Sequence, residues 1–333
     1  NKSQTIVIEE LNSNYSQFYY TFPSGFTVEK GKEYSLYFEV VDNDALHNGK
    51  ITKSKLFNFG LLNDNELKNK ELQSQKAIIN NLDTSLEKVK DQQKVLKDIN
   101  KEQKESNNLN YNEKKEIQDF LQKQQEQESL MEKFSKQLKN NLKKQDTDTK
   151  KNKLLQERLE RQELQAKKNQ KLLEELNKVA DKINKEELTK KLEELAKKQK
   201  NSERNLEQLL ELTKRYYVTE KINQLAKDLK ELSEKQKSLS KENNEEKSLE
   251  EQLKLIKEFN SLSKELEELN KDNEALKKPL DLEVNSEKQD AIKNDQKDAK
   301  DSLEEKISDK KKDEMGEKVS KKQKSAAQKM KEL

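Results

Sequence analysis

The 333-residue sequence predicts a mainly α-helical protein with a short amino-terminal β region, and three observations lead to this fold class. Charged residues make up 41% of the chain and hydrophobic residues only 29%, which is too polar for one large globular core. Eleven of the 17 aromatic residues and four of the five glycines fall within residues 1–60. Beyond about residue 63, apolar residues recur in alternating steps of three and four, the spacing of coiled-coil-like helices.

Residues 1–62 have the pattern of short strands and turns. Runs of β-branched and aromatic residues alternate with Gly, Pro, Asn and Ser. These runs are TIVIEEL (5–11), QFYYTF (17–22), EYSLYFEVV (33–41) and KITKSKLFNF (50–59). About four strands are too few for an immunoglobulin-like sandwich of roughly 100 residues. We therefore expect residues 1–62 to be the carboxyl-terminal part of such a sandwich, with its other strands upstream.

The segment DNDALHNG (42–49) is predicted to turn the chain between the third and fourth runs. Gly49 suits a turn position with positive φ. A calcium site is the alternative, with oxygen ligands from Asp42, Asn43, Asp44 and Asn48. Their spacing does not match the twelve-residue helix–loop–helix pattern, and His47, the single histidine, has no partner His or Cys for a metal. We therefore expect a plain hairpin turn, with no metal and no cofactor.

From about residue 63 to the carboxyl terminus the hydrophobic period changes from two to seven. The clearest seam consists of Leu155, Leu159, Gln162, Ala166, Asn169, Leu173, Leu176, Ala180 and Ile183. Shorter seams consist of Leu82, Leu86, Val89, Gln93 and Leu96, and of Met131, Phe134 and Leu138. Such seams must bury against other helices, and their polar members partly set which helix each one meets.

Breaks in the pattern divide this region into antiparallel helices of roughly 25–40 residues. SNNLNYNEKK (106–115) and KQDTDTKKNK (144–153) lack apolar periodicity. Pro279 cannot lie inside a helix without breaking or kinking it, so it separates a helical region over 63–278 from a further helical segment over 279–333. Capping-box spacing predicts two further helix starts, at Asn184 with Glu187 and at Ser248 with Glu251.

A 37-residue repeat begins at Leu188, Leu225 and Leu262, with the shared pattern L-x3-L-x2-L. Because 37 is a multiple of neither seven nor eleven, the seam would rotate along one uninterrupted coiled coil, so we expect the repeats on separate helices. The nine leucines are candidate protein-contact residues, and the alternative is that they pack the repeats against each other. They are Leu188, Leu192, Leu195, Leu225, Leu229, Leu232, Leu262, Leu266 and Leu269.

Three segments carry a family resemblance: YFEVVDNDALHNGKITKSKLF (37–57), ALKKPLDLEVNSEKQDAIKNDQKDAKDSLEE (275–305) and KKQKSAAQKMKEL (321–333). Together with the helical region between them, they resemble a family of very large Bacteroidota cell-envelope proteins of unknown function. That family combines amino-terminal membrane helices, an immunoglobulin-like periplasmic domain and long helical repeats. The resemblance implies a structural role in the bacterial periplasm, with an anchor in the inner membrane supplied by an upstream segment. It carries no catalytic residues to this chain.

Charge and residue types narrow the classes of function. The 69 basic and 66 acidic residues nearly cancel and only four of the basic residues are arginine, so we expect no nucleic-acid partner. The absence of Cys excludes disulfides, zinc–thiolate sites and cysteine nucleophiles. No stretch approaches the roughly 20 apolar residues of a membrane helix. Any membrane contact is therefore expected to come from a segment outside this sequence.

Catalysis is not expected either, because the carboxylates are scattered over solvated helix faces. General acid–base chemistry needs a shaped, desolvated pocket, which such helices seldom form. We expect a non-enzymatic scaffold of the bacterial cell envelope that contacts protein partners or a second copy through helical seams. The alternative is a chaperone-like or client-guiding helical module.

Overall fold

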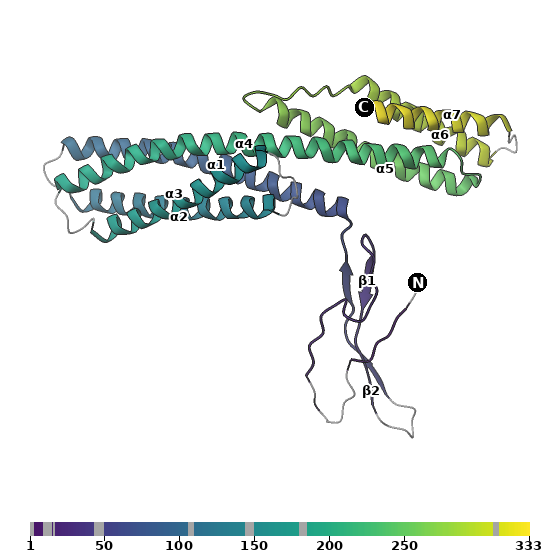
Figure 1. Ribbon diagram of the computed structural model, residues 1–333, viewed down its shortest axis with the longest axis horizontal. Coiled ribbons are helices and arrows are strands. Elements are labelled where there is room, and N and C mark those ends of the chain that lie inside the picture. Colours follow the sequence, from purple (N-terminus) through teal and green to yellow (C-terminus); the bar gives the residue numbers. More distant parts are fainter. Residues whose placement is uncertain are drawn as a thin grey trace. The chain divides into compact units, whose positions relative to one another are not determined.

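The computed structural model describes residues 3–8, 15, 17–42, 50–105, 110–143, 150–179, 185–308 and 313–333 (Figure 1). In these ranges the strands are β1 (Glu33–Leu36), β2 (Glu39–Val41), β3 (Ile51–Lys53) and β4 (Phe57–Gly60). The helices are α1 (Asp64–Glu105), α2 (Tyr111–Lys143), α3 (Lys150–Val179), α4 (Lys185–Leu239), α5 (Glu245–Glu274), α6 (Ser286–Ser308) and α7 (Asp313–Glu332). The protein is mainly α with a short amino-terminal β part, which confirms the predicted fold class. The chain forms two compact units, residues 1–70 and 71–333.

The first unit contains two separate antiparallel strand pairs. β1 pairs with β4, and β2 pairs with β3. The third and fourth predicted runs are therefore each divided into two strands. The division is held by Ser54, whose side-chain oxygen accepts a hydrogen bond from the backbone N–H of Phe38 at 2.9 Å while its own N–H donates to the carbonyl of Phe38 at 2.9 Å.

The first two predicted runs form no strand within residues 3–8 and 17–20. Three aromatic residues of the second run, Phe18, Tyr20 and Phe22, instead contact rings in or beside the strands. Phe22 stacks on Phe59 with ring centroids 4.7 Å apart, and Phe18 meets the edge of Phe38 at 5.2 Å. Contacts between rings, rather than backbone pairing, thus account for the β-like composition of QFYYTF.

The predicted turn at 42–49 lies almost wholly outside the described residues, including His47 and the proposed calcium ligands Asn43, Asp44 and Asn48. Its two ends are described and are joined across the hairpin. The N–H of Lys50 donates to Asp42 Oδ1 at 2.7 Å, and the N–H of Asp42 donates to the carbonyl of Lys50 at 3.1 Å. Val41 pairs with Ile51, so β2 and β3 form the two arms of the predicted hairpin.

Asparagine residues provide the amino-terminal caps of four helices. Asn63 and Asn110 each accept a bond from a glutamate N–H three residues later, and the glutamate side chain accepts the asparagine N–H in return. Asn244 and Asn285 cap α5 and α6 through their Oδ1 atoms. The predicted cap at Ser248 is wrong, because Asn244 satisfies the free N–H groups one turn earlier and Ser248 is buried inside α5. Asn184 lies outside the described residues.

Each predicted break includes a boundary between two helices, since α1 ends at Glu105, α2 runs from Tyr111 to Lys143, α3 begins at Lys150, and Pro279 lies between α5 and α6. The predicted breaks are too long, because residues 111–115 and 150–153 are helical. Most members of the predicted seams are buried as well, and Val89 and Gln93 of α1 are half-buried. On α3 the buried members are Leu155, Leu159, Gln162, Ala166, Asn169, Leu173 and Leu176, whereas Ala180 and Ile183 lie outside the described residues. Apolar residues of α1, α2, α3 and α4 form two clusters, and those of α4, α5, α6 and α7 form a third.

Candidate functional site

The nine candidate leucines lie in the helical cores. Leu188, Leu192 and Leu195 belong to a cluster with residues of α1, α2 and α3. Leu225, Leu229, Leu232, Leu266 and Leu269 belong to the cluster formed by α4, α5, α6 and α7, and Leu262 is half-buried against it. In the folded chain these side chains therefore contact other helices of the same molecule.

The first two repeats lie on the same helix, α4, which corrects the expectation of one helix per repeat. No Gly or Pro interrupts residues 185–239, and α4 runs for 55 residues, well beyond the expected length. A shift of 37 residues turns a side chain by about 100° beyond ten full turns. The leucines of the first repeat (the first leucine stripe) consequently face α1, α2 and α3, whereas those of the second repeat face α5, α6 and α7. Figure 1 shows the course of α4 past both sets of helices.

The polar position that follows each leucine stripe is buried in all three repeats: Gln199, Gln236 and Asn273. Asn273 holds the chain that follows Pro279. Its Nδ2 donates to the carbonyl of Leu280 at 2.9 Å, and its Oδ1 accepts the N–H of Leu280 at 2.7 Å. The repeat thus places an amide side chain inside a core each time, and each amide has a different role.

A layer of four glutamines crosses the core of α4, α5, α6 and α7. Gln236 Nε2 donates to Gln252 Oε1 at 2.8 Å, Gln296 Nε2 donates to Gln236 Oε1 at 3.0 Å, and Gln323 Nε2 donates to Gln252 Oε1 at 3.1 Å. Each helix contributes one glutamine, and none is more than 1% exposed. Because a buried amide is costly without partners, sliding one helix along another would break this layer, so the layer fixes the axial register.

Asp295 clamps α7 onto α6. Its carboxylate accepts hydrogen bonds from Lys322 at 3.1 Å, from Ser325 at 2.7 Å and from Lys329. Burial alone would raise the pKa of Asp295, but these bonds outweigh it and lower the pKa below its ordinary value. The pair of lysines thereby holds a charged aspartate in a nearly buried position.

Tyr217 lies where the two halves of the helical unit meet, because it packs against both the α1–α4 cluster and the α4–α7 cluster. Lys76 of α1 lies 5.3 Å from the ring centroid of Tyr217 and also pairs with Asp272 of α5. Burial, with a smaller contribution from Asp272, raises the pKa of Tyr217 to about 12. Beside it, Arg215 Nη1 donates to the carbonyl of Lys278 at 3.0 Å.

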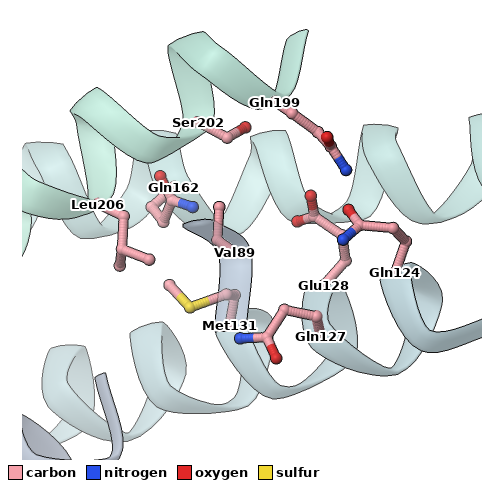
Figure 2. A pocket seen from close by; sticks show the side chains of 9 residues that line it. All are labelled: Val89, Gln124, Gln127, Glu128, Met131, Gln162, Gln199, Ser202 and Leu206. Atoms are coloured by element: carbon pink, nitrogen blue, oxygen red, sulfur yellow. The ribbon is translucent and has the colours of Figure 1, made fainter. Parts of the chain in front are cut away.

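A second polar layer lies between the two apolar clusters of α1, α2, α3 and α4, around a cavity of about 20 Å3 (Figure 2). That volume suffices for one water molecule. The lining residues are Val89 from α1, Gln124, Gln127, Glu128 and Met131 from α2, Gln162 from α3, and Gln199, Ser202 and Leu206 from α4. Glu128 is the single titratable residue among them.

Glu128 is held in this layer by an amide and not by a cation. Its Oε1 accepts a hydrogen bond from Asn169 Nδ2 at 2.7 Å. Burial raises the pKa of Glu128 to about 7, and the bond from Asn169 opposes this only in part. Glu163 shows the opposite behaviour on α3, because hydrogen bonds from Lys139 and Lys167 lower its pKa to about 2. The pKa values of two glutamates in one bundle thus differ because Glu163 has lysine partners and Glu128 has none among the described residues.

Sequence reasoning did not single out Glu128 or the two polar layers. A signal was present, because Gln124 and Gln127 extend the seam of Met131 and Phe134 backward in steps of three and four. Glu128 lies next to that seam and looks like one more solvated carboxylate among 66.

In the described part of the chain, no group of three or more His, Cys, Asp or Glu side chains is placed to hold a metal ion. None of the described helices has the length and apolar character needed to cross a membrane. Comparison of the chain with protein-family models, with curated proteins and with solved structures finds no match.

Proposed function

We propose that the chain is a non-enzymatic structural protein of the bacterial cell envelope, which acts as a scaffold through helical contacts with protein partners or with a second copy. The observation that supports this most directly is α4, whose 55 residues correspond to about 80 Å of uninterrupted helix. Both halves of α4 are packed against other helices. A helix held along its length is a stiff spacer, which suits a protein that sets the distance between partners.

The periplasmic location and an upstream inner-membrane anchor rest on the family resemblance of residues 37–57, 275–305 and 321–333. Protease added to spheroplasts of the native bacterium tests the location. A periplasmic chain is degraded while a cytoplasmic control protein survives. Survival of the chain together with that control would contradict the proposed location.

A chaperone-like or client-guiding module is the second candidate. Such a module holds clients through exposed apolar stripes, whereas eight of the nine repeat leucines are buried here and Leu262 is half-buried. Large apolar side chains that are exposed on the described helices occur singly, as at Val95, Leu164 and Ile307. This favours a scaffold over a client holder.

Site-specific photocrosslinking in intact cells separates the two functions. A photoreactive amino acid at exposed Val95 or Leu164 of the full chain is expected to give a few discrete partner bands. The same amino acid at Leu192, which is fully buried, should crosslink only within the chain. A broad smear of many crosslinked proteins from both exposed positions would contradict the scaffold and support the client-holding alternative.

A further inference from the structure

We propose that Glu128 and Gln199 form a proton-responsive contact inside the bundle of α1, α2, α3 and α4, and that loss of one proton from Glu128 loosens the packing of α4 in this bundle. This inference does not depend on the scaffold function. It assigns to the polar layer a role in regulating the helical unit.

The contact lies among uncharged side chains, and Glu128 is half-buried there. Figure 2 shows Gln199 of α4 reaching from above toward Glu128 and Gln124 of α2. Gln124 and Gln199 are 3% and 4% exposed, so neither amide has ready access to solvent. Gln124, Gln199 and Glu128 line the same small cavity between the helices.

The hydrogen-bonding groups around Glu128 suit a change of protonation. Both amide atoms of Gln199 and the Nε2 of Gln124 are buried without a hydrogen-bond partner in the described structure. A protonated Glu128 donates one O–H, and the free Oε1 of Gln199 is an acceptor for it. An ionised Glu128 only accepts, and rotation of the Gln199 amide then offers Nε2 instead. The same pair thus has a hydrogen bond available in either state.

The charges around the layer do not neutralise an ionised Glu128. The residues that face it from α1, α3 and α4 are uncharged. Nearby charged groups are paired with each other. Lys90 of α1 pairs with Glu207 of α4 at 2.9 Å and also lies near Glu203. Glu132 of α2 pairs with Lys136 at 2.5 Å and with Lys167 of α3 at 3.8 Å, and Glu163 of α3 pairs with Lys139 at 2.6 Å. An ionised Glu128 therefore has amide donors but no cation among the described residues to offset its desolvation, and movement of α4 away from the bundle relieves this cost by admitting water.

The sign of the effect follows from the raised pKa. Below the ordinary pKa of 4.5, the carboxyl of Glu128 is neutral whether α4 is packed in the bundle (closed) or has moved away from it (open), so there is no cost of burying a charge. As pH rises toward about 7, the open bundle ionises first, so opening becomes progressively easier. With these two pKa values, the equilibrium constant for opening rises roughly tenfold between pH 6 and pH 8.

Hydrogen exchange of the full chain tests the proposal, with rates corrected for the intrinsic rise of exchange with pH. Amides of residues 195–206 are expected to lose roughly tenfold protection between pH 6 and pH 8, whereas residues 225–232 of the same helix keep theirs. The loss should be absent in Glu128→Gln and unchanged in Glu126→Gln, which alters an exposed glutamate on the same helix. Protection of residues 195–206 that is independent of pH, or a loss that persists in Glu128→Gln, would overturn the proposal.

Carbon-13 and nitrogen-15 spectra of the unmodified chain give a second test that does not depend on a variant folding. The chemical shifts of the Glu128 carboxyl carbon and of the Gln199 side-chain amide should change together as pH rises, with a midpoint near pH 7. A Glu128 carboxyl that titrates near its ordinary value of 4.5, or a Gln199 amide that does not follow it, would contradict the proposed contact.

Discussion

Gln236 and Gln252 hydrogen-bond to each other through both amide groups: Nε2 of Gln236 donates to Oε1 of Gln252 at 2.8 Å, and Nε2 of Gln252 donates back to Oε1 of Gln236 at 3.3 Å. Both side chains are fully buried, and each also accepts from a glutamine of α6 or α7. One reciprocal amide pair therefore aligns α4 with α5 and forms the centre of the four-helix layer.

Replacing Gln236 with Leu is expected to destabilise the protein, because the amides of Gln252 and Gln296 lose partners in a site that water does not reach. The free energy of unfolding should fall by about 1–3 kcal/mol, measured by urea denaturation. Gln122→Leu, at an exposed position on α2, serves as the matched control and should change it by less than about 0.5 kcal/mol. Equal effects of the two substitutions would argue against a structural role for the layer.

Asp295→Asn is expected to weaken the clamp between α6 and α7, because a neutral amide replaces a carboxylate that accepts from two lysines. The cost should be about 1–3 kcal/mol at neutral pH. Since the folded-state pKa of Asp295 is lowered, its contribution is present above the unfolded value near 3.8 and is lost as pH falls through the folded value. Unfolding free energies measured between pH 2 and pH 6 should therefore converge for the two proteins at the acidic end. A constant difference across this range would contradict the assignment.

Leu192→Glu and Leu229→Glu should damage different parts of the molecule, although both residues occupy the same position of the repeat on one helix. Leu192 lies in the core with α1, α2 and α3, and Leu229 lies in the core with α5, α6 and α7. Hydrogen exchange should locate the lost protection accordingly, with a lower melting temperature in both variants. If both variants stay fully protected and fail only to bind partners, the leucines act as protein-contact residues instead.

Tyr217→Ala should make the two halves of the helical unit unfold at different denaturant concentrations, because the side chain packs against both cores. The loss of stability should be about 1–3 kcal/mol, and Tyr217→Phe, which keeps the ring, should retain most of it. Pulsed hydrogen exchange across a urea series reports each helix separately. Simultaneous loss of protection in α1–α3 and α5–α7 of the Ala variant would show that Tyr217 does not link them.

The isolated chain is expected to be a monomer, because the seams of α1 to α7 are covered by helices of the same molecule. Light scattering should give a mass near 39.2 kDa. A mass of twice that value would show that further surfaces pair between two chains.

Much of the helical architecture follows from local sequence features. The α3 seam is predictable because each described member keeps strict steps of three and four, and Pro279 predicts the end of α5 through its missing N–H. The continuity of α4 does not follow from a pattern that gives each helix one partner surface. A 37-residue shift conflicts with a single seam but fits a helix that faces two cores.

The polar layers could not be assigned from the sequence, because a glutamine at a seam position gives the same sequence pattern whether its amide binds water or another amide. Gln236 and Gln199 occupy equivalent repeat positions, yet the side chain of Gln236 is hydrogen-bonded to other glutamines and that of Gln199 has no hydrogen-bond partner among the described residues. The difference depends on side chains from helices distant in sequence, such as Gln323 and Glu128. Likewise, the high pKa of Glu128 arises from burial by α3 and α4, which no local pattern encodes.

The continuity of α4 also determines how the chain can be divided. A flexible linker normally lets two modules be expressed, exchanged or lost independently, but here the connection is itself one wall of each module. A fragment that ends within residues 200–220 loses some of the α4 residues of the amino-terminal core, and it loses nearly all α4 residues of the carboxyl-terminal core. A cut within α4, or removal of either set of its neighbours, is therefore expected to expose part of a core, so the helical unit should behave as a single piece when the chain is truncated or recombined.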